Sequence, residues 1–222
     1  MRSVSSVSSR QSFRAEEWAD ATLACGSVAL FALIAAAAIK LHEMGFTRIY
    51  GNPNLHGWWY LPISYLIVLG LQDTCFYFCH RCFHHPRIYR WTHRGHHRSR
   101  HPSPLTSFAL DPIETLQHGL VLLGIILVLP LHPATLLAVL TTMTAWTVMN
   151  HLSPEQLPAR FPHHWLGRWI IGPAHHSIHH RKQTVHFGLY FTWWDKVLNT
   201  QDNSYPALLR PLPLPTRSWP TG

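Results

Sequence analysis

The stretch that decides the fold is residues 58–84, WWYLPISYLIVLGLQDTCFYFCHRCFH. Residues 58–78 form an apolar run long enough to cross, as a helix, the roughly 30 Å hydrocarbon core of a bilayer. The tryptophan pair that opens the run is typical of a membrane interface. The stretch ends with His80 and His84, which lie four residues apart and therefore on one face of a helix. It predicts a membrane-spanning helix that carries histidines to the membrane surface.

Three further apolar runs indicate more membrane helices. Residues 18–39 are broken only by Asp20 and small polar groups, and their length favours an uncleaved helix over a signal peptide. Residues 113–129 and 134–149 are joined by Pro-Leu-His-Pro, which predicts a tight helical hairpin. We therefore expect an all-α integral membrane protein with about four transmembrane helices. A histidine-rich helical cap should lie on one side of the membrane.

The basic residues predict the orientation of these helices. With four spans, 16 of the 18 Lys and Arg residues fall in the segments that share a side with the two termini. The positive-inside rule then places both termini and the histidine-rich segments in the cytoplasm, at a bacterial inner membrane or the endoplasmic reticulum. It also accounts for the net charge of +8 without nucleic acid as a partner. We expect a cytoplasmic tail at 1–17, one membrane domain at 18–200 and a Pro-rich C-terminal tail at 201–222.

Histidine is the residue that points to chemistry. The chain has 19 histidines, of which 15 lie in the segments 80–101 and 151–186, and only four cysteines, too few and too clustered for a disulfide framework. Besides His80 and His84, two groups have helical spacing: His93, His96 and His97, then His176, His179 and His180. Each group can aim its imidazoles at one point.

A metal centre is the interpretation that the three groups favour together. A single pair of histidines four apart is common by chance, whereas eight in three groups exceed what one tetrahedral zinc ion uses and fit two metal ions with positions left open. Imidazole also suits zinc and copper. Zinc is therefore the less favoured occupant, and a non-catalytic zinc- or copper-binding membrane protein is the alternative to an enzyme.

The segments 73–84, 91–97, 173–180 and 187–200 together resemble the fatty acid hydroxylase and sterol desaturase superfamily of membrane di-iron oxygenases. The resemblance covers about residues 58–200. Segments 104–118 and 146–151 are similar to the sterol C-5 desaturase branch. A carotenoid hydroxylase-like enzyme shares the histidine boxes and is the second enzymatic alternative.

The resemblance implies an O2-dependent enzyme that hydroxylates or desaturates a sterol or fatty acyl lipid taken from the bilayer. It implies an external electron donor, a ferredoxin or a b-type cytochrome with its reductase, and no catalytic residue beyond the metal centre. Histidine spacing does not separate hydroxylation from desaturation. The implied ligands of two iron ions are His80, His84, His93, His96, His97, His151, His176, His179 and His180.

Some positions around these ligands remain open from sequence. His175 creates an HH-x-x-HH pattern, so the third box could use His175 in place of His176. Asp73 lies inside an apolar run, where a carboxylate is costly unless it has a role. We expect it either to accept a hydrogen bond from the N–H of a ligand imidazole or to be an ordinary paired polar group at a helix interface. Supporting roles are also predicted for His175, Asn150 and Asp195, and less strongly for Asp111 and Glu114, although Asp111 and Asp195 could equally be helix caps.

Overall fold

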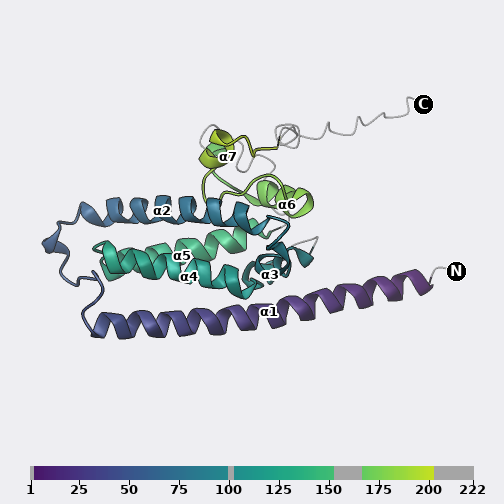
Figure 1. Cartoon of the computed structure of the whole chain (residues 1–222), viewed down its shortest axis with the longest axis horizontal. Helices are drawn as coiled ribbons and strands as arrows, with labels where there is room; N and C mark the ends of the chain where they lie inside the picture. The colour runs from purple at the N-terminus through teal and green to yellow at the C-terminus, as the bar shows by residue number, and fades with distance from the viewer. Residues whose placement is uncertain (1–2, 100–102, 153–166, 203–222) are drawn as a thin grey trace, which may run out of the picture.

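Four long helices form the body of the protein (Figure 1). The computed structural model describes residues 3–99, 103–152 and 167–202. The long helices are α1 (Ser3–Glu43), α2 (Tyr60–Phe83), α4 (Pro112–Val128) and α5 (Pro133–Asn150). α1 packs on α4, and α2 packs on both α4 and α5. In the described part of the chain all named elements are helical, which confirms the predicted class.

Local sequence signals explain where the helices begin. Pro112 and Pro133 each open a helix, where the missing N–H of proline costs nothing and its fixed φ favours the first turn. The ring of His132 also caps α5 by accepting from the Ala134 N–H at 3.1 Å. The hairpin is tight, as predicted, and Leu131 exchanges backbone hydrogen bonds with the α1–α2 connection at Arg48 and Tyr50. The three histidine groups lie toward the other end of α2 and beyond it.

Large apolar side chains cover the outside of all four long helices. Leu33, Leu66, Val128 and Leu137, one from each helix, are 61 to 75% exposed. Apolar surface of this extent is unfavourable in water and suits contact with lipid. Ala15–Glu43 and Tyr60–Phe83 are long and apolar enough to span a bilayer, and α4 is a shorter apolar helix. These features are consistent with a membrane protein.

The structure describes most of the predicted N-terminal tail and little of the predicted C-terminal tail. α1 already begins at Ser3, so most of the expected tail at 1–17 continues the first helix as one rod. The apolar run starts only at residue 18, and the helix extends from it toward the N-terminus as far as Ser3. The C-terminal tail lies outside the described residues except for 201 and 202.

Short helices gather at one end of the bundle and form a cap (Figure 1). Asp20 fastens this cap to α1, because its Oδ2 atom accepts from the hydroxyl of Ser99 at 2.7 Å and from that of Thr106 at 2.8 Å. The polar residue that interrupts the first apolar run thus has a structural role. The short elements are α3 (Tyr89–Thr92), η2 (His96–Arg98), η3 (Thr106–Phe108), η5 (Gly167–Trp169), α6 (Pro173–Lys182) and α7 (Trp193–Val197), while η1 (Pro53–Leu55) lies between α1 and α2.

Candidate metal centre

The cap brings all nine histidines singled out from sequence into two adjacent clusters. Within each cluster, one ring nitrogen from every histidine lies within 4.8 Å of the others. Both clusters draw on segments far apart in the chain, so neither could form from one box alone. The first cluster is His80, His84, His93, His97 and His179, and the second is His96, His151, His176 and His180.

Helical geometry sorts neighbouring histidines between the two clusters. On α6, His176 and His180 lie one turn apart and enter the second cluster, while His179 points to the first. On η2, the successive residues His96 and His97 also diverge, one to each cluster. α6 and η2 therefore each contribute histidines to both clusters.

Hydrogen bonds at Nδ1 fix the tautomers of several of these rings. His80 Nδ1 lies 3.0 Å from the carbonyl oxygen of Phe187, and His179 Nδ1 lies 2.7 Å from that of Val185. His151 Nδ1 lies 2.8 Å from the carbonyl oxygen of Thr147. A carbonyl oxygen can only accept, so Nδ1 carries the proton and the neutral ring presents its lone pair at Nε2.

The Nε2 atoms then converge on one another. The Nε2 atoms of His80 and His93 are 2.9 Å apart, and those of His151 and His176 are 3.1 Å apart. Lone pairs at these distances repel each other unless a cation lies among them. Burial lowers the pKa of His151 to about 3 and the pKa values of His93 and His176 well below their usual range, so these rings are neutral at neutral pH and their lone pairs are free for a metal ion. The donor set fits two metal ions.

The structure places His176, not His175, in the second cluster. The Nε2 atom of His176 lies 3.1 Å from that of His151 and 3.0 Å from that of His180. His175 is buried elsewhere, where its Nδ1 atom accepts from the Gly172 N–H at 3.1 Å and its ring packs against His186. It thereby caps the start of α6, which fixes the helix that carries three histidines of the clusters.

Glu114 is the carboxylate that touches an imidazole. Its Oε2 atom lies 2.8 Å from His93 Nδ1, with both side chains buried. Sequence reasoning ranked it below Asp73, although the same rule applied to both: a carboxylate inside an apolar helix needs a partner. The sequence did not show that His93 is the partner of Glu114, because His93 lies on another element 21 residues earlier.

Asp73 acts on a loop instead of on a histidine. Its Oδ1 atom accepts three backbone N–H groups, from Leu189 at 3.1 Å, Tyr190 at 2.7 Å and Phe191 at 3.1 Å. The expected contact with a ligand imidazole is replaced by these three bonds. Because this loop also supplies the Phe187 carbonyl that holds His80, Asp73 influences the first cluster through the backbone.

Asp195 fixes the same loop from α7. Its two carboxylate oxygens accept from the N–H groups of Phe187 at 2.9 Å and Gly188 at 3.1 Å, and Oδ1 also accepts from the Thr200 hydroxyl at 2.7 Å. The Thr200 hydroxyl in turn lies 2.8 Å from the hydroxyl of Tyr77 on α2. The segment after the third box is thus held rigidly against α2.

Asp111 and Asn150 border the clusters without joining them. Asp111 Oδ2 accepts from the Gly95 N–H at 2.6 Å and from the His96 N–H at 3.4 Å, and so anchors η2. Asn150 is buried beside His151, and its Oδ1 atom has no hydrogen-bond partner among the described residues.

An apolar cavity of about 80 Å³ reaches the second cluster from among the long helices. Its walls include Phe31 of α1, Phe76 of α2 and Thr144 of α5, and it ends at His96 and His151. His118 also faces this cavity and stacks on Phe76, outside both clusters. The cavity suits an apolar ligand that approaches from the bundle.

Comparison with known proteins gives a consistent family. The family model described as "Fatty acid hydroxylase" matches residues 65–200, which include all nine clustered histidines. A Delta(7)-sterol 5(6)-desaturase of Gibberella zeae is 29% identical over 164 residues, covering 74% of this chain and 49% of the relative. Lathosterol oxidase of Rattus norvegicus is 31% identical over 161 residues, covering 71% of this chain and 52% of the relative. Human lathosterol oxidase is 30% identical over 167 residues, covering 74% of this chain and 54% of the relative.

The chain spans about half the length of the curated relatives it matches. No solved structure matches it significantly. The matched region begins within α2 and ends at Thr200, so it contains the second helix, the hairpin and the cap. On this match, and on the histidine pattern within it, the chain belongs to the fatty acid hydroxylase family and is similar to its sterol desaturases.

Proposed function

We propose that this protein is a membrane oxidoreductase that uses two iron ions and O2 to hydroxylate or desaturate a lipid, with a sterol as the first candidate substrate. The observation that carries the proposal is the convergence of nine imidazoles in two adjacent clusters. The similarity to sterol desaturases and lathosterol oxidase supports the substrate class. Zinc is the alternative occupant, because imidazole ligands do not by themselves exclude it.

The chain's own residues would hold and orient the reaction partners. When bound, two iron ions would supply the activation of O2 and the removal of hydrogen from an unactivated C–H bond. The imidazoles would hold the ions as neutral ligands, and Glu114 and the carbonyls of Phe187, Val185 and Thr147 keep the Nε2 lone pairs directed inward. The apolar cavity would present one lipid segment to the second cluster and keep water away.

The reaction requires electrons from outside the chain. Hydroxylation converts C–H and O2, with two electrons and two protons, into C–OH and one water, whereas desaturation removes two hydrogens and yields two waters. The four cysteines are single thiols without the clustered spacing of a four-cysteine iron–sulfur site. A ferredoxin or a b-type cytochrome with its reductase would therefore supply the electrons.

We also propose that all four long helices cross the membrane, with both termini and the two clusters in the cytoplasm. The exposed apolar side chains on every long helix support this arrangement. The distribution of basic residues supports the orientation, because with four spans the sequence segments on the side of the two termini hold 16 of the 18 Lys and Arg residues. Accessibility of cysteines introduced at each end of α2 to a membrane-impermeant reagent would test it.

The decisive experiment compares lipids by mass in the native host with and without this gene, complemented by wild type, His96→Ala or His42→Ala. His42 is exposed at the opposite end of α1 and serves as the matched control. A lipid that gains one oxygen or loses two hydrogens only with wild type and the control variant would identify both substrate and reaction. A change in carotenoids alone would move the assignment to a carotenoid hydroxylase.

Metal content separates the enzyme from a metal-binding protein. The purified protein should contain about two iron ions per chain, and His96→Ala should lose metal from the second cluster. Unchanged lipids together with zinc or copper in both clusters would contradict the proposed function.

A further inference from the structure

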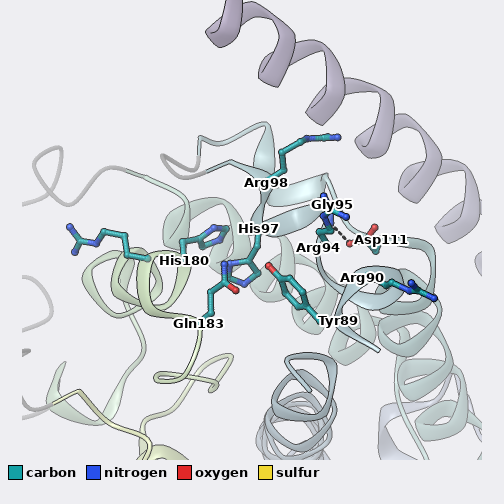
Figure 2. Close-up of a pocket in the computed structure, with 10 residues that line it drawn as sticks. Tyr89, Arg90, Arg94, Gly95, His97, Arg98, Asp111, His180 and Gln183 are labelled. Atoms are coloured by element: carbon teal, nitrogen blue, oxygen red, sulfur yellow. Dashed lines mark hydrogen bonds between the residues drawn. The ribbon is translucent and has the colours of Figure 1, made fainter. Parts of the chain in front are cut away.

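A second opening reaches the clusters from the cap side. We name it the cap mouth: its floor is formed by His97 and His180, and its rim by Arg90, Arg94, Arg98 and Arg181. The cavity has a volume of about 1030 Å³. Figure 2 shows the two imidazoles at its centre, one from each cluster. The apolar cavity meets different histidines, so the mouth and the cavity approach the clusters separately.

The rim carries positive charge that the described carboxylates neutralise only in part. All four arginines are exposed, and within residues 3–99, 103–152 and 167–202 no carboxylate forms an ion pair with Arg90, Arg94 or Arg181. Arg98 lies 3.7 Å from Asp20. Asp111 also lines the mouth, where its carboxylate accepts from the backbone of η2 and offsets part of the positive charge of the rim.

The directions of the arginines indicate the size of the partner. In Figure 2, Arg90 and Arg98 extend away from the two imidazoles, Arg98 toward α1, so their guanidinium groups do not meet at one point. A site for one small anion needs donors that converge on a point. Donors that spread around an opening suit several carboxylates on an extended surface, as in complexes guided by complementary charge.

We propose that the cap mouth is the docking surface for a soluble, acidic one-electron carrier protein. This inference rests on the proposed function, which needs two electrons per O2. Each docked carrier would be oxidised by one electron and leave, so two dockings supply one turnover. His97 of the first cluster and His180 of the second both line the mouth, so a carrier docked there would lie beside both metal positions.

Binding of purified carriers to the full-length protein in neutral-lipid nanodiscs tests the proposal directly. The probes are a small acidic [2Fe–2S] ferredoxin and a small acidic b-type cytochrome. Arg94→Glu and Arg181→Glu should each raise the Kd about tenfold and flatten its dependence on salt. Arg87→Glu makes the same charge change at an exposed cap residue outside the mouth and should alter the Kd by less than about twofold. Arg94→Gln, with unchanged metal content, controls for folding.

The outcomes separate this inference from the proposed function. Equal effects of Arg94→Glu and Arg87→Glu, or no binding of either carrier to wild type, would overturn the docking surface. Displacement of a bound carrier by inorganic phosphate at low concentration would assign the mouth to a small anion. Loss of carrier binding when the neutral lipids of the nanodisc are replaced by anionic lipids would assign the mouth to lipid headgroups. Carrier binding that depends on Arg94 without any lipid product would leave the docking surface standing and refute the proposed function.

Discussion

His93 Nδ1 lies 2.8 Å from Oε2 of Glu114, and both side chains are buried at the junction of the cap and α4. The carboxylate accepts the Nδ1 proton and directs the opposite nitrogen toward His80, 2.9 Å away. One hydrogen bond on α4 thus orients a ring of the first cluster. The pair therefore links the first histidine cluster to helix α4.

Replacing Glu114 should weaken metal binding without removing a ligand. Glu114→Leu leaves His93 Nδ1 without an acceptor, and loss of such an outer hydrogen bond lowers metal affinity by about 10- to 100-fold. Glu114→Gln keeps an acceptor oxygen and should lose less. Competition with a chelator measures both, and Glu43→Gln, at the exposed end of α1, provides the control. Identical affinities for Glu114→Leu and wild type would contradict a role for this pair.

Removing the Asp195 carboxylate should loosen the loop that holds His80. Asp195→Ala leaves the N–H groups of Phe187 and Gly188 and the Thr200 hydroxyl without their acceptor, and each buried unpaired group costs about 1–3 kcal/mol. Asp195→Asn should be milder because one oxygen remains. Hydrogen exchange of residues 186–191 is the measurement. Exchange should speed up in both variants, and protection equal to wild type in Asp195→Ala would rule out the role.

The metal-free protein should lose stability as the pH falls from about 6.5 toward 4. The pKa of His84 and of His151 is lowered to about 3 by burial and by His96, and that of His96 to about 4 by burial. In this range an unfolded chain binds protons that the folded chain excludes, so stability decreases with decreasing pH. The thermal midpoint in detergent should therefore drop below pH 6.5 for the metal-free form. A midpoint that rises or stays level would show that these rings are protonated in the folded state.

Gly95 should tolerate no side chain, whereas Gly124 should accept one. A Cβ atom at Gly95 would lie 2.6 Å from Asp111 Oδ1 and 2.8 Å from Leu23 Cδ2, so Gly95→Ala must displace the carboxylate that anchors η2. Overpacking of this kind costs about 1–3 kcal/mol, and His96 and His97 would shift with η2. Gly124→Ala, which meets nothing within 4 Å, should be neutral or stabilising. Thermal midpoint and metal content distinguish the two, and equal behaviour would contradict the tight approach at Gly95.

Filling the apolar cavity should block turnover while sparing the metal. Thr144→Trp places an indole where the cavity approaches the second cluster, and Leu137→Trp on the same helix points to the outside. We expect turnover to fall by at least about 100-fold in the first variant, with both variants keeping their metal. Full turnover by Thr144→Trp would mean that the lipid reaches the clusters by another path.

Local patterns predicted much of the architecture. Apolar runs and proline positions indicated α2, the hairpin and its ends, because these depend on contacts between near neighbours along the chain. The i, i+3 and i+4 spacing indicated which histidines share a face. The eight residues so chosen, with His151, which only the family resemblance implied, are the nine that lie in the two clusters, although the spacing could not choose between His175 and His176.

The sequence by itself determined the helices, the three histidine groups and the excess of basic residues beside them, because helical periodicity and charge are local properties. Only the tertiary structure decided how His96 and His97 divide between two clusters, and that Glu114 contacts a ring while Asp73 holds a loop 116 residues away. The reason is physical: a hydrogen bond needs a partner at about 3 Å, and only the packing of α2, α4 and α6 brings these distant segments together.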